Sequence, residues 1–443
     1  MKLLKRLHRA HFFTLFNFHD EYAKGRSCLL LHNALLSAIS WLSTGLFYTS
    51  FLMANGINIV NIGILTFLPY IASCFSIFSP SILERFARRR WILAGGRLAY
   101  DLIILLGITI MPLLVSDPTT KMVLFVVLTF TANIINALFS SGYMVWHVNF
   151  IPESVRAEFF SINTTVTSFI GCGAALLSSV VADALAGSAY EDTVIVIFRY
   201  VALALAMLDL VILSLPKEYP YKKSKELPRL RHIVTKPFRH KKFALTMAMV
   251  FAWTFFINVP MSSLNYYLIN DVGVTYSFIY IINMFYPFFL LIFMPVWKKF
   301  LNRKGWFITF AVGGLLHCPT NLLYSCVTAA NYGWLIPIVR LTQHFLGVGT
   351  NVAYANMLYI NLPDSDQTNY VAFHTLVVNI ASFLGMMAGT GFVAANPDIL
   401  VRVFGTGFTN VQILLWVEAL GELLVPLAVL KLLPQLTPDP VQA

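Results

Sequence analysis

The chain has 443 residues, of which 58% are hydrophobic and 12% are charged, and its mean hydropathy is +0.72. Soluble domains average about 45–50% apolar and about 25% charged residues, so this composition excludes a soluble globular protein. The net charge of +11 does not indicate nucleic-acid binding, because no soluble domain presents the basic residues on one face. The five cysteines show no metal-ligand spacing, and the sequence predicts neither a disulfide framework, a zinc site nor a cofactor.

The first 27 residues mix Lys, Arg and His with Leu and Phe, without the apolar core or cleavage site of a signal peptide. We expect a basic amphipathic helix on the cytoplasmic surface of the membrane. Apolar runs of about 20 residues or more follow, each long enough to cross ~30 Å of hydrocarbon as a helix. Six are predicted in the first half, at residues 28–54, 57–82, 91–115, 122–150, 157–185 and 194–215.

A basic segment, residues 216–242, carries ten Lys or Arg and two acids and separates the two halves of the chain. Six further helices are predicted beyond it, at residues 243–269, 276–294, 306–327, 332–361, 370–395 and 408–433. A short tail, 434–443, completes the chain. The expected fold is all-α, with twelve transmembrane helices in two pseudo-symmetric six-helix bundles, 28–215 and 243–433.

Landmarks recur in the same order in the two halves, as expected for a duplicated unit. Gly56 corresponds to Gly273 and Pro69 to Pro287, at offsets of 217 and 218 residues. Inverted or parallel repeats of helices are typical of membrane transporters, in which the binding site lies near mid-membrane between the repeats. The pattern therefore favours a transporter, and we expect a monomer.

Basic residues gather at the connections on one side of the predicted bundles and predict the orientation. They are Lys2, Lys5, Arg6, Arg9, Lys24, Arg26, Arg85, Arg88 to Arg90, the segment 216–242, Lys298, Lys299, Arg303 and Lys304. The other side holds little more than Lys121 and Arg402. The positive-inside rule then places both termini in the cytoplasm of a multi-pass protein of the inner cell membrane.

The connection from Pro80 to Arg90, PSILERFARRR, resembles the loop G-x-x-x-D-R-x-G-R-R of the major facilitator superfamily. In that family the loop's acid and arginines are thought to latch the two bundles on the cytoplasmic side, so the resemblance implies a gating role for Glu84 and Arg85. Lipid anchoring is the alternative, at about 1 kcal/mol for each basic residue, and we prefer it for Arg88 to Arg90.

Two further stretches extend this resemblance over residues 28–433. Residues 146–156, WHVNFIPESVR, are similar to the bacterial pattern W-x-x-D-x-x-P-x-x-x-R; they would form another gate contact or a helix stop at Pro152, and we prefer the helix stop. A weaker copy of the first loop runs from Pro295 to Lys304, between the predicted eighth and ninth helices. The resemblance implies transport by alternating access of the two bundles.

Polar residues recur at steps of three and four on the predicted helices one, four, seven and ten, so that each set shares one face. The sets are Asn33, Ser37, Ser40, Thr44 and Tyr48; Asn133, Asn136, Ser140, Tyr143 and His147; Thr254, Asn258, Met261 or Ser262, and Asn265; and Arg340, His344, Gly347, Asn351 and Tyr354. The resemblance implies that these helices line the central cavity and bind a small solute. Hydrogen bonds between helices, or to a residue's own i−4 carbonyl, are the alternative for any single Ser, Thr or Asn.

Charged residues inside predicted helices need partners. Arg340 would bind a carboxylate or phosphate of the solute, or else extend to the outer interface. Arg97 and Asp101 are four residues apart and can pair within one helix, close to the predicted gate. Three acids, Asp209, Glu418 and Glu422, are either protonated, bonded to neighbours or part of a proton path, and with His344 they are the candidates for proton coupling.

The function predicted from the sequence is secondary-active transport of a small solute, for which proton coupling is one option. A facilitator without ion coupling, a transport-incompetent sensor and an integral-membrane enzyme remain as alternatives. The sequence contains no P-loop, which argues against an ATP-driven pump, and no catalytic cluster that would favour an enzyme.

Overall fold

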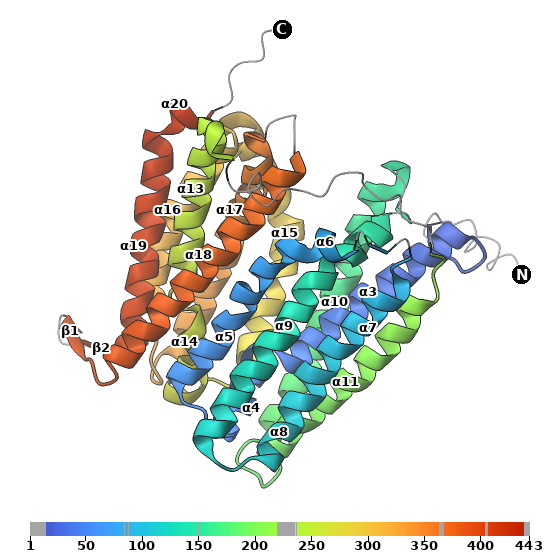
Figure 1. The fold of residues 1–443 in the computed structure, drawn as a ribbon. Coiled ribbons are helices and arrows are strands. Elements are labelled where there is room, and N and C mark those ends of the chain that lie inside the picture. The colour runs from blue at the N-terminus through green and yellow to red at the C-terminus, as the bar shows by residue number, and fades with distance from the viewer. Residues whose placement is uncertain are drawn as a thin grey trace, which may run out of the picture. The chain divides into compact units, whose positions relative to one another are not determined.

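The computed structural model describes residues 15–83, 85–86, 88–148, 150–151, 153–218, 235, 237–362, 367–403 and 406–437 (Figure 1). The chain forms two compact units, each described separately below. The N-terminal unit comprises residues 1–56 and 75–227, and the C-terminal unit comprises residues 57–74 and 228–443.

The N-terminal unit is built from long helices, with α10 and α11 both packed against α3. Its elements are α3 (Glu21–Ser43), α4 (Gly45–Ala54), α6 (Ser79–Leu83), α7 (Arg90–Asp101), the π-helix η2 (Leu102–Gly107), α8 (Ile108–Leu114), α9 (Pro118–Val148), α10 (Glu153–Leu185) and α11 (Glu191–Ser214). A 3-10 turn, η1 (Cys74–Phe78), leads into α6.

The C-terminal unit is also helical, and α16 packs against both α17 and α19. Its elements are α5 (Ile59–Ser73), η3 (Pro237–Arg239), α13 (Lys241–Asn258), α14 (Met261–Tyr266), η4 (Tyr267–Asp271), α15 (Tyr276–Lys304), α16 (Trp306–Tyr324), α17 (Tyr332–Ile360), α18 (Gln367–Ala395), β1 (Val401–Val403), β2 (Thr406–Phe408), α19 (Asn410–Lys431) and α20 (Leu433–Leu436). Helix α5 packs on α18, with the rings of Phe67 and Phe383 5.3 Å apart. The bundle boundaries 28–215 and 243–433 remain a prediction.

Eleven helical segments among the described residues are long and apolar enough to cross a membrane. Helix α17 is not one of them, although its 29 residues at 1.5 Å each would span about 43 Å. Its polar residues lower its hydropathy, and they include Arg340, Gln343 and His344. The helix predicted at residues 332–361 is therefore present, with an unusually polar composition for a membrane span.

Several predicted boundaries differ from the structure, two of them by more than a few residues. The first helix begins at Glu21 rather than at residue 28, because Asp20 caps it by accepting a hydrogen bond from the Ala23 amide at 2.8 Å. Helix α15 runs through Pro295 to Lys304, so the predicted loop at 295–304 is wrong. Proline within a membrane helix is tolerated because neighbouring groups replace the missing hydrogen bond.

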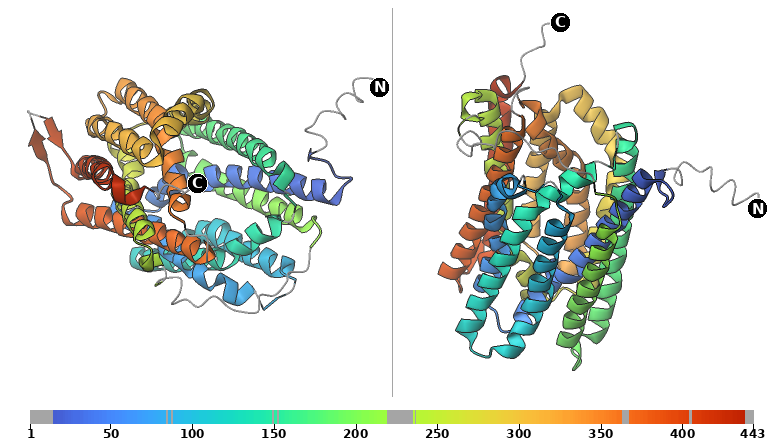
Figure 2. Two further views of the ribbon diagram at one scale, coloured as in Figure 1. Left: turned by 90° about the horizontal axis from the view of Figure 1, so that it is seen from above. Right: turned by 45° about the vertical axis from the view of Figure 1, so that its right-hand side comes forward.

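A short antiparallel hairpin, in which β1 pairs with β2, joins α18 to α19 and departs from the purely helical prediction. Val401 lies opposite Phe408, and Val403 lies opposite Thr406. The hairpin projects sideways from the ends of α18 and α19, away from the other helices of the C-terminal unit (Figures 1 and 2). It replaces the first residues of the predicted twelfth helix, which starts instead at Asn410.

The first helix of each half is interrupted at a corresponding position. In the first half α3 passes to α4 at Thr44, and Gly45 has a φ of +59° that favours glycine. In the second half α13 ends at Asn258, and Pro260 precedes α14. Glycines with matching φ angles, +77° at Gly56 and +76° at Gly273, precede the second helix of each half. These shared irregularities support an internal duplication.

Close helix packing in the C-terminal unit depends on small residues on α18. The Cα of Gly389 lies against the carbonyl oxygen of Val259, and that of Gly385 lies against the carbonyl of Phe255. A Cβ at either position would overlap backbone atoms, so only glycine fits the observed spacing. Small residues that allow close approach are typical of helix interfaces in membranes.

Candidate solute-binding cavity

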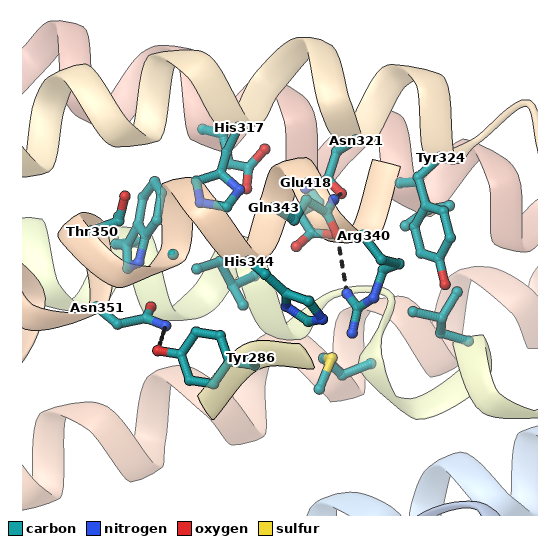
Figure 3. Close-up of a pocket in the computed structure, with 17 residues that line it drawn as sticks. Tyr286, His317, Asn321, Tyr324, Arg340, Gln343, His344, Thr350, Asn351 and Glu418 are labelled. Atoms are coloured by element: carbon teal, nitrogen blue, oxygen red, sulfur yellow. Dashed lines mark hydrogen bonds between the residues drawn. The ribbon is translucent and has the colours of Figure 1, made fainter. Parts of the chain in front are cut away.

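A cavity of about 350 Å³ lies within the C-terminal unit (Figure 3). This volume is within the range of about 300–1,000 Å³ that is usual for small-molecule sites. Its polar lining comes from α15, α16, α17 and α19, and its apolar lining mainly from α13, α14 and Leu415 of α19. The residues that line it are Trp253, Ile257, Met261, Leu264, Tyr286, His317, Asn321, Tyr324, Arg340, Gln343, His344, Gly347, Thr350, Asn351, Leu415, Glu418 and Glu422.

The guanidinium of Arg340 is held at the cavity wall by neutral oxygens (Figure 3). Its Nη1 donates to the side-chain oxygen of Gln343 at 3.1 Å, and its Nη2 donates to that of Asn283 at 3.1 Å. It also lies 5.8 Å from the centre of the Tyr324 ring. The part of the chain that the structure describes contains no ion pair of Arg340. The positive charge is therefore oriented but not neutralised by direct contact.

Two acids of α19, Glu418 and Glu422, lie on the same cavity. Asn321 of α16 adjoins both carboxyl groups, and Arg340 is a charged neighbour of Glu418. The Asn321 side-chain oxygen accepts a hydrogen bond from Gln343 Nε2 at 2.7 Å, so it connects the acid pair to the group that holds Arg340. Glu418 and Glu422 therefore lie in a polar cluster together with Asn321, Gln343 and Arg340.

His344 and Asn351 continue the polar side of α17. The His344 Nε2 lies 3.0 Å from the carbonyl oxygen of Ile282, and because a carbonyl only accepts, this nitrogen carries the hydrogen. The Asn351 Nδ2 donates to the Tyr286 hydroxyl at 3.1 Å, and the Tyr286 and His344 rings are 5.5 Å apart. These contacts place an aromatic and amide surface beside the charged cluster (Figure 3).

Met261 and Gly347 of the predicted stripes also line this cavity, whereas Thr254, Asn258, Asn265 and Tyr354 do not. Thr254 and Tyr354 join their hydroxyl groups at 2.5 Å, which links α13 to α17. Asn258 donates to the carbonyl of Thr254 at 2.8 Å, and Asn265 is half-buried on α14. For Thr254, Asn258 and Tyr354 the observed contacts match the structural alternative of bonding between helices or within one helix.

In the N-terminal unit most of the predicted stripe also bonds to neighbouring backbone or helices. Asn33 Nδ2 donates to Asn163 Oδ1 at 2.9 Å, and Ser37 donates to the Thr167 carbonyl at 2.9 Å. The remaining contacts are from Thr44 to the Ser40 carbonyl, Asn133 to the Thr129 carbonyl and Tyr143 to the Leu93 carbonyl, while Tyr48 lies under Arg199 and Asn136 is half-buried. The side chains of Ser140 and His147 lie outside the described residues.

Buried charges of the N-terminal unit are paired or held by backbone. Arg97 and Asp101 pair at 2.9 Å within α7, as their spacing allows. Asp209 of α11, which is fully buried, lies 2.7 Å from Nδ1 of His32 on α3. Bonding to a neighbour therefore accounts for Asp209, one of the three possibilities left open by the sequence.

Arg199 of α11 is 1% exposed and forms no ion pair in the described part of the chain. Three oxygens accept hydrogen bonds from it: the Thr109 hydroxyl at 2.7 Å, the Ile104 carbonyl at 2.5 Å and the Ser43 carbonyl at 3.4 Å. The two carbonyls belong to the π-helix η2 and to the end of α3. Interruptions of regular helix thus provide the acceptors that a buried guanidinium requires.

The predicted gate is only partly described. Glu84 lies outside the described residues, and Arg85 is exposed. Glu218, at the start of the basic segment, accepts hydrogen bonds from the amides of Arg89 and Arg90 at 2.5 and 2.9 Å and so caps α7. The latch formed by Glu84 and Arg85 remains a prediction.

Sequence reasoning did not identify several residues that define these clusters. They are His32, Arg199, Asn283, His317 and Asn321. Each is a polar residue in an otherwise apolar helix, and that signal alone could have selected them. The predicted stripes lie on the first, fourth, seventh and tenth helices, whereas these residues lie beside the stripe on α3 or on other helices.

The long apolar helices and the polar cavity define a multi-pass membrane transporter. Residues 30–390 match the Major Facilitator Superfamily, and the chain belongs to this family. The chain is therefore a transporter rather than an enzyme. No curated protein matched the sequence.

Several solved transporters share the fold at low sequence identity. A variant of the nucleoside transporter NupG has a TM-score of 0.69 at 11% identity, with 93% of this chain and 99% of that chain covered. The D-xylose–proton symporter has a TM-score of 0.66 at 14% identity, covering 97% and 99%. A bacterial homologue of the iron transporter ferroportin has a TM-score of 0.67 at 13% identity, covering 92% and 98%.

Proposed function

We propose that the protein carries a small polar solute across the inner cell membrane by alternating access, with both termini in the cytoplasm, and that the solute binds in the C-terminal cavity. This proposal rests on the environment of the Arg340 guanidinium. The guanidinium is fixed by two amide oxygens and reaches the cavity without an ion-pair partner among the described residues. A solute with a carboxylate, phosphate or carbonyl group would complete its hydrogen bonds.

The surrounding groups support an amphipathic solute of modest size. Trp253, Tyr286 and Tyr324 provide aromatic surface, and Asn351 and Gln343 provide amide groups. The similar solved structures include transporters of nucleosides and of D-xylose, and polar solutes of that size are consistent with a cavity of about 350 Å³.

The first experiment identifies the solute. A metabolite library is screened for compounds that raise the thermal stability of the purified protein, and each hit is tested for uptake into proteoliposomes. Arg340→Lys should fold but lose most binding, because an ammonium group cannot reproduce the planar pair of donors of guanidinium. The matched control is Arg402→Lys, which changes an exposed arginine in the hairpin and should bind normally.

Transport measurements separate the remaining alternatives. Uptake above the external concentration, driven by an imposed pH gradient, would identify proton-coupled secondary-active transport. Equilibration without accumulation would identify a facilitator, and binding without any movement of solute would identify a sensor. Normal binding by Arg340→Lys would refute the assignment of Arg340 to the site.

A further inference from the structure

Glu418 and Glu422 are four residues apart on α19 and line the cavity together. This spacing places them on one face, one helical turn apart. Glu422 is 3% exposed, and its Oε2 has no hydrogen-bond partner in the described part of the chain. Glu418 has Glu422 and Arg340 as its charged neighbours. The site thus contains two acids, the nearby cation Arg340 and one carboxyl oxygen of Glu422 that forms no hydrogen bond with the described residues.

The other titratable groups around the pair come from α15, α16 and α17. Helix α16 contributes His317, Cys318 and Tyr324, and α17 contributes Arg340 and His344. The Tyr286 hydroxyl of α15 accepts a hydrogen bond from Asn351. The residues of α13 and α14 that line the cavity do not titrate, and α18 contributes none.

Charge balance determines how many protons the pair can hold. Two carboxylates in one poorly hydrated site do not both ionise readily, because each disfavours the charge of the other. A cation that is already present favours one ionised carboxylate, and Arg340 supplies that charge beside Glu418. A second cation on His317 would face repulsion, because Arg340 is its charged neighbour. One ionised acid, one neutral acid and one guanidinium leave the cluster electrically neutral.

We propose that Glu418 and Glu422 form a proton-binding site that shares one proton while the cavity is empty of solute and takes up a second when an anionic group pairs with Arg340. The second half of this proposal rests on the proposed solute site. An anion at Arg340 removes the positive charge that kept one acid ionised, and a proton from solution then restores neutrality. One negative charge bound at Arg340 is thus accompanied by one proton, which fills the capacity of the pair.

Infrared spectroscopy of the reconstituted full chain tests the site without any solute. The protein is labelled with ¹³C at the glutamate carboxyl groups, which separates their bands from those of aspartates such as Asp209. The probe is the C=O band of protonated glutamic acid at neutral pH, measured relative to the double variant Glu418→Gln/Glu422→Gln. The wild type should show one protonated carboxyl group more than the double variant.

Single variants distinguish a shared proton from two independent acids. Either Glu418→Gln or Glu422→Gln should lose the band completely, because the acid that remains is then the one carboxyl group among the lining residues that can balance the charge of Arg340. Arg340→Gln should double the band, because no cation then favours an ionised acid. This variant reproduces the charge of a cavity in which an anion has neutralised Arg340. The matched control Glu191→Gln removes an exposed acid at the start of α11 and should leave the band unchanged.

Three results would overturn the proposal. They are a wild-type band equal to that of the double variant, a full band that survives in either single variant, or an unchanged band in Arg340→Gln. Each comparison uses protein that elutes as a single folded species, and the single variants test the sharing independently of Arg340→Gln. Because the infrared measurements use no solute, a negative result would not refute the proposed solute site. Conversely, normal solute binding by Arg340→Lys would not refute the shared proton.

Discussion

The contact between Gly389 and the Val259 carbonyl allows a prediction whose two energetic terms can be separated. Gly389→Ala adds a Cβ that would overlap the backbone oxygen of Val259, so α18 must move away from α13. Overpacking of this kind typically costs about 1–3 kcal/mol. Alanine is also a better helix former than glycine, by about 1 kcal/mol. The net change expected for Gly389→Ala is therefore a loss of about 0–2 kcal/mol.

Gly391, two residues further along α18, provides the matched control. A Cβ at Gly391 meets nothing within 4 Å, so Gly391→Ala gains the helix preference without the overlap. We expect this variant to be about 1 kcal/mol more stable than the wild type. The difference between the two alanine variants isolates the steric cost, at about 1–3 kcal/mol.

The assay is equilibrium unfolding in mixed micelles, followed by circular dichroism, with thermal stability as a second measure. Gly389→Ala should unfold at a lower denaturant concentration than the wild type or at the same one, and Gly391→Ala at a higher one. Equal shifts in the two variants would refute the argument, because the packing of α18 against Val259 would then carry no steric cost.

Three further predictions concern the topology, His344 and Asp117. Reporters inserted in segment 216–242 or after Ala443 should be cytoplasmic and one at Asp398 external; an external signal at Ala443 would disprove the orientation. His344→Gln should retain solute binding and leave its pH dependence unchanged, because Arg340 is a charged neighbour of His344 and disfavours a second cation there; a flattened pH profile would contradict this. Hydrogen bonds from the Thr120 backbone amide and side chain lower the pKa of Asp117, at the start of α9, below its ordinary value of 3.8. The Asp117 carboxylate therefore stabilises α9 at pH values above 3.8, and this stabilisation is lost as the pH falls through the lowered pKa of the folded protein. Amide exchange in the first turn of α9 should accelerate over that pH range in the wild type but not in Asp117→Ala.

Much of the helical plan could be predicted from the sequence because lipid imposes a simple rule on length and hydropathy. The turns at Gly56 and Gly273 were identifiable from their place between apolar runs, and both have the positive φ angles that favour glycine. The path of α15 through Pro295 was not predictable, because a proline ends a helix in water but is tolerated where neighbouring groups replace its hydrogen bond. The start of α3 at Glu21 was likewise not predictable from composition, because Asp20 caps the helix within a polar segment.

The candidate site was predictable on α17 and α19, where Glu418 and Glu422 are charged residues in an otherwise apolar helix. Arg340, His344 and Asn351 are polar at helical spacing, and the structure places all three on the cavity. Asn283, the partner of Arg340, and Asn321, the partner of Gln343, come from other helices, and pairing between helices leaves no periodic signal in a single sequence. The same limit applies to His32 and Asp209, which are 177 residues apart in the chain but 2.7 Å apart in the fold.

The polarity of α17 has a consequence for how the chain is inserted during synthesis. An arginine near the centre of a helix adds up to about 3 kcal/mol to the free energy of membrane insertion. Helices α15 and α16 are synthesised before α17, and they carry Asn283 and Asn321, the hydrogen-bond partners of Arg340 and Gln343. We therefore expect α17 to enter the bilayer efficiently only beside these two helices. Glu418 of α19 arrives last, after the guanidinium beside it is already in place.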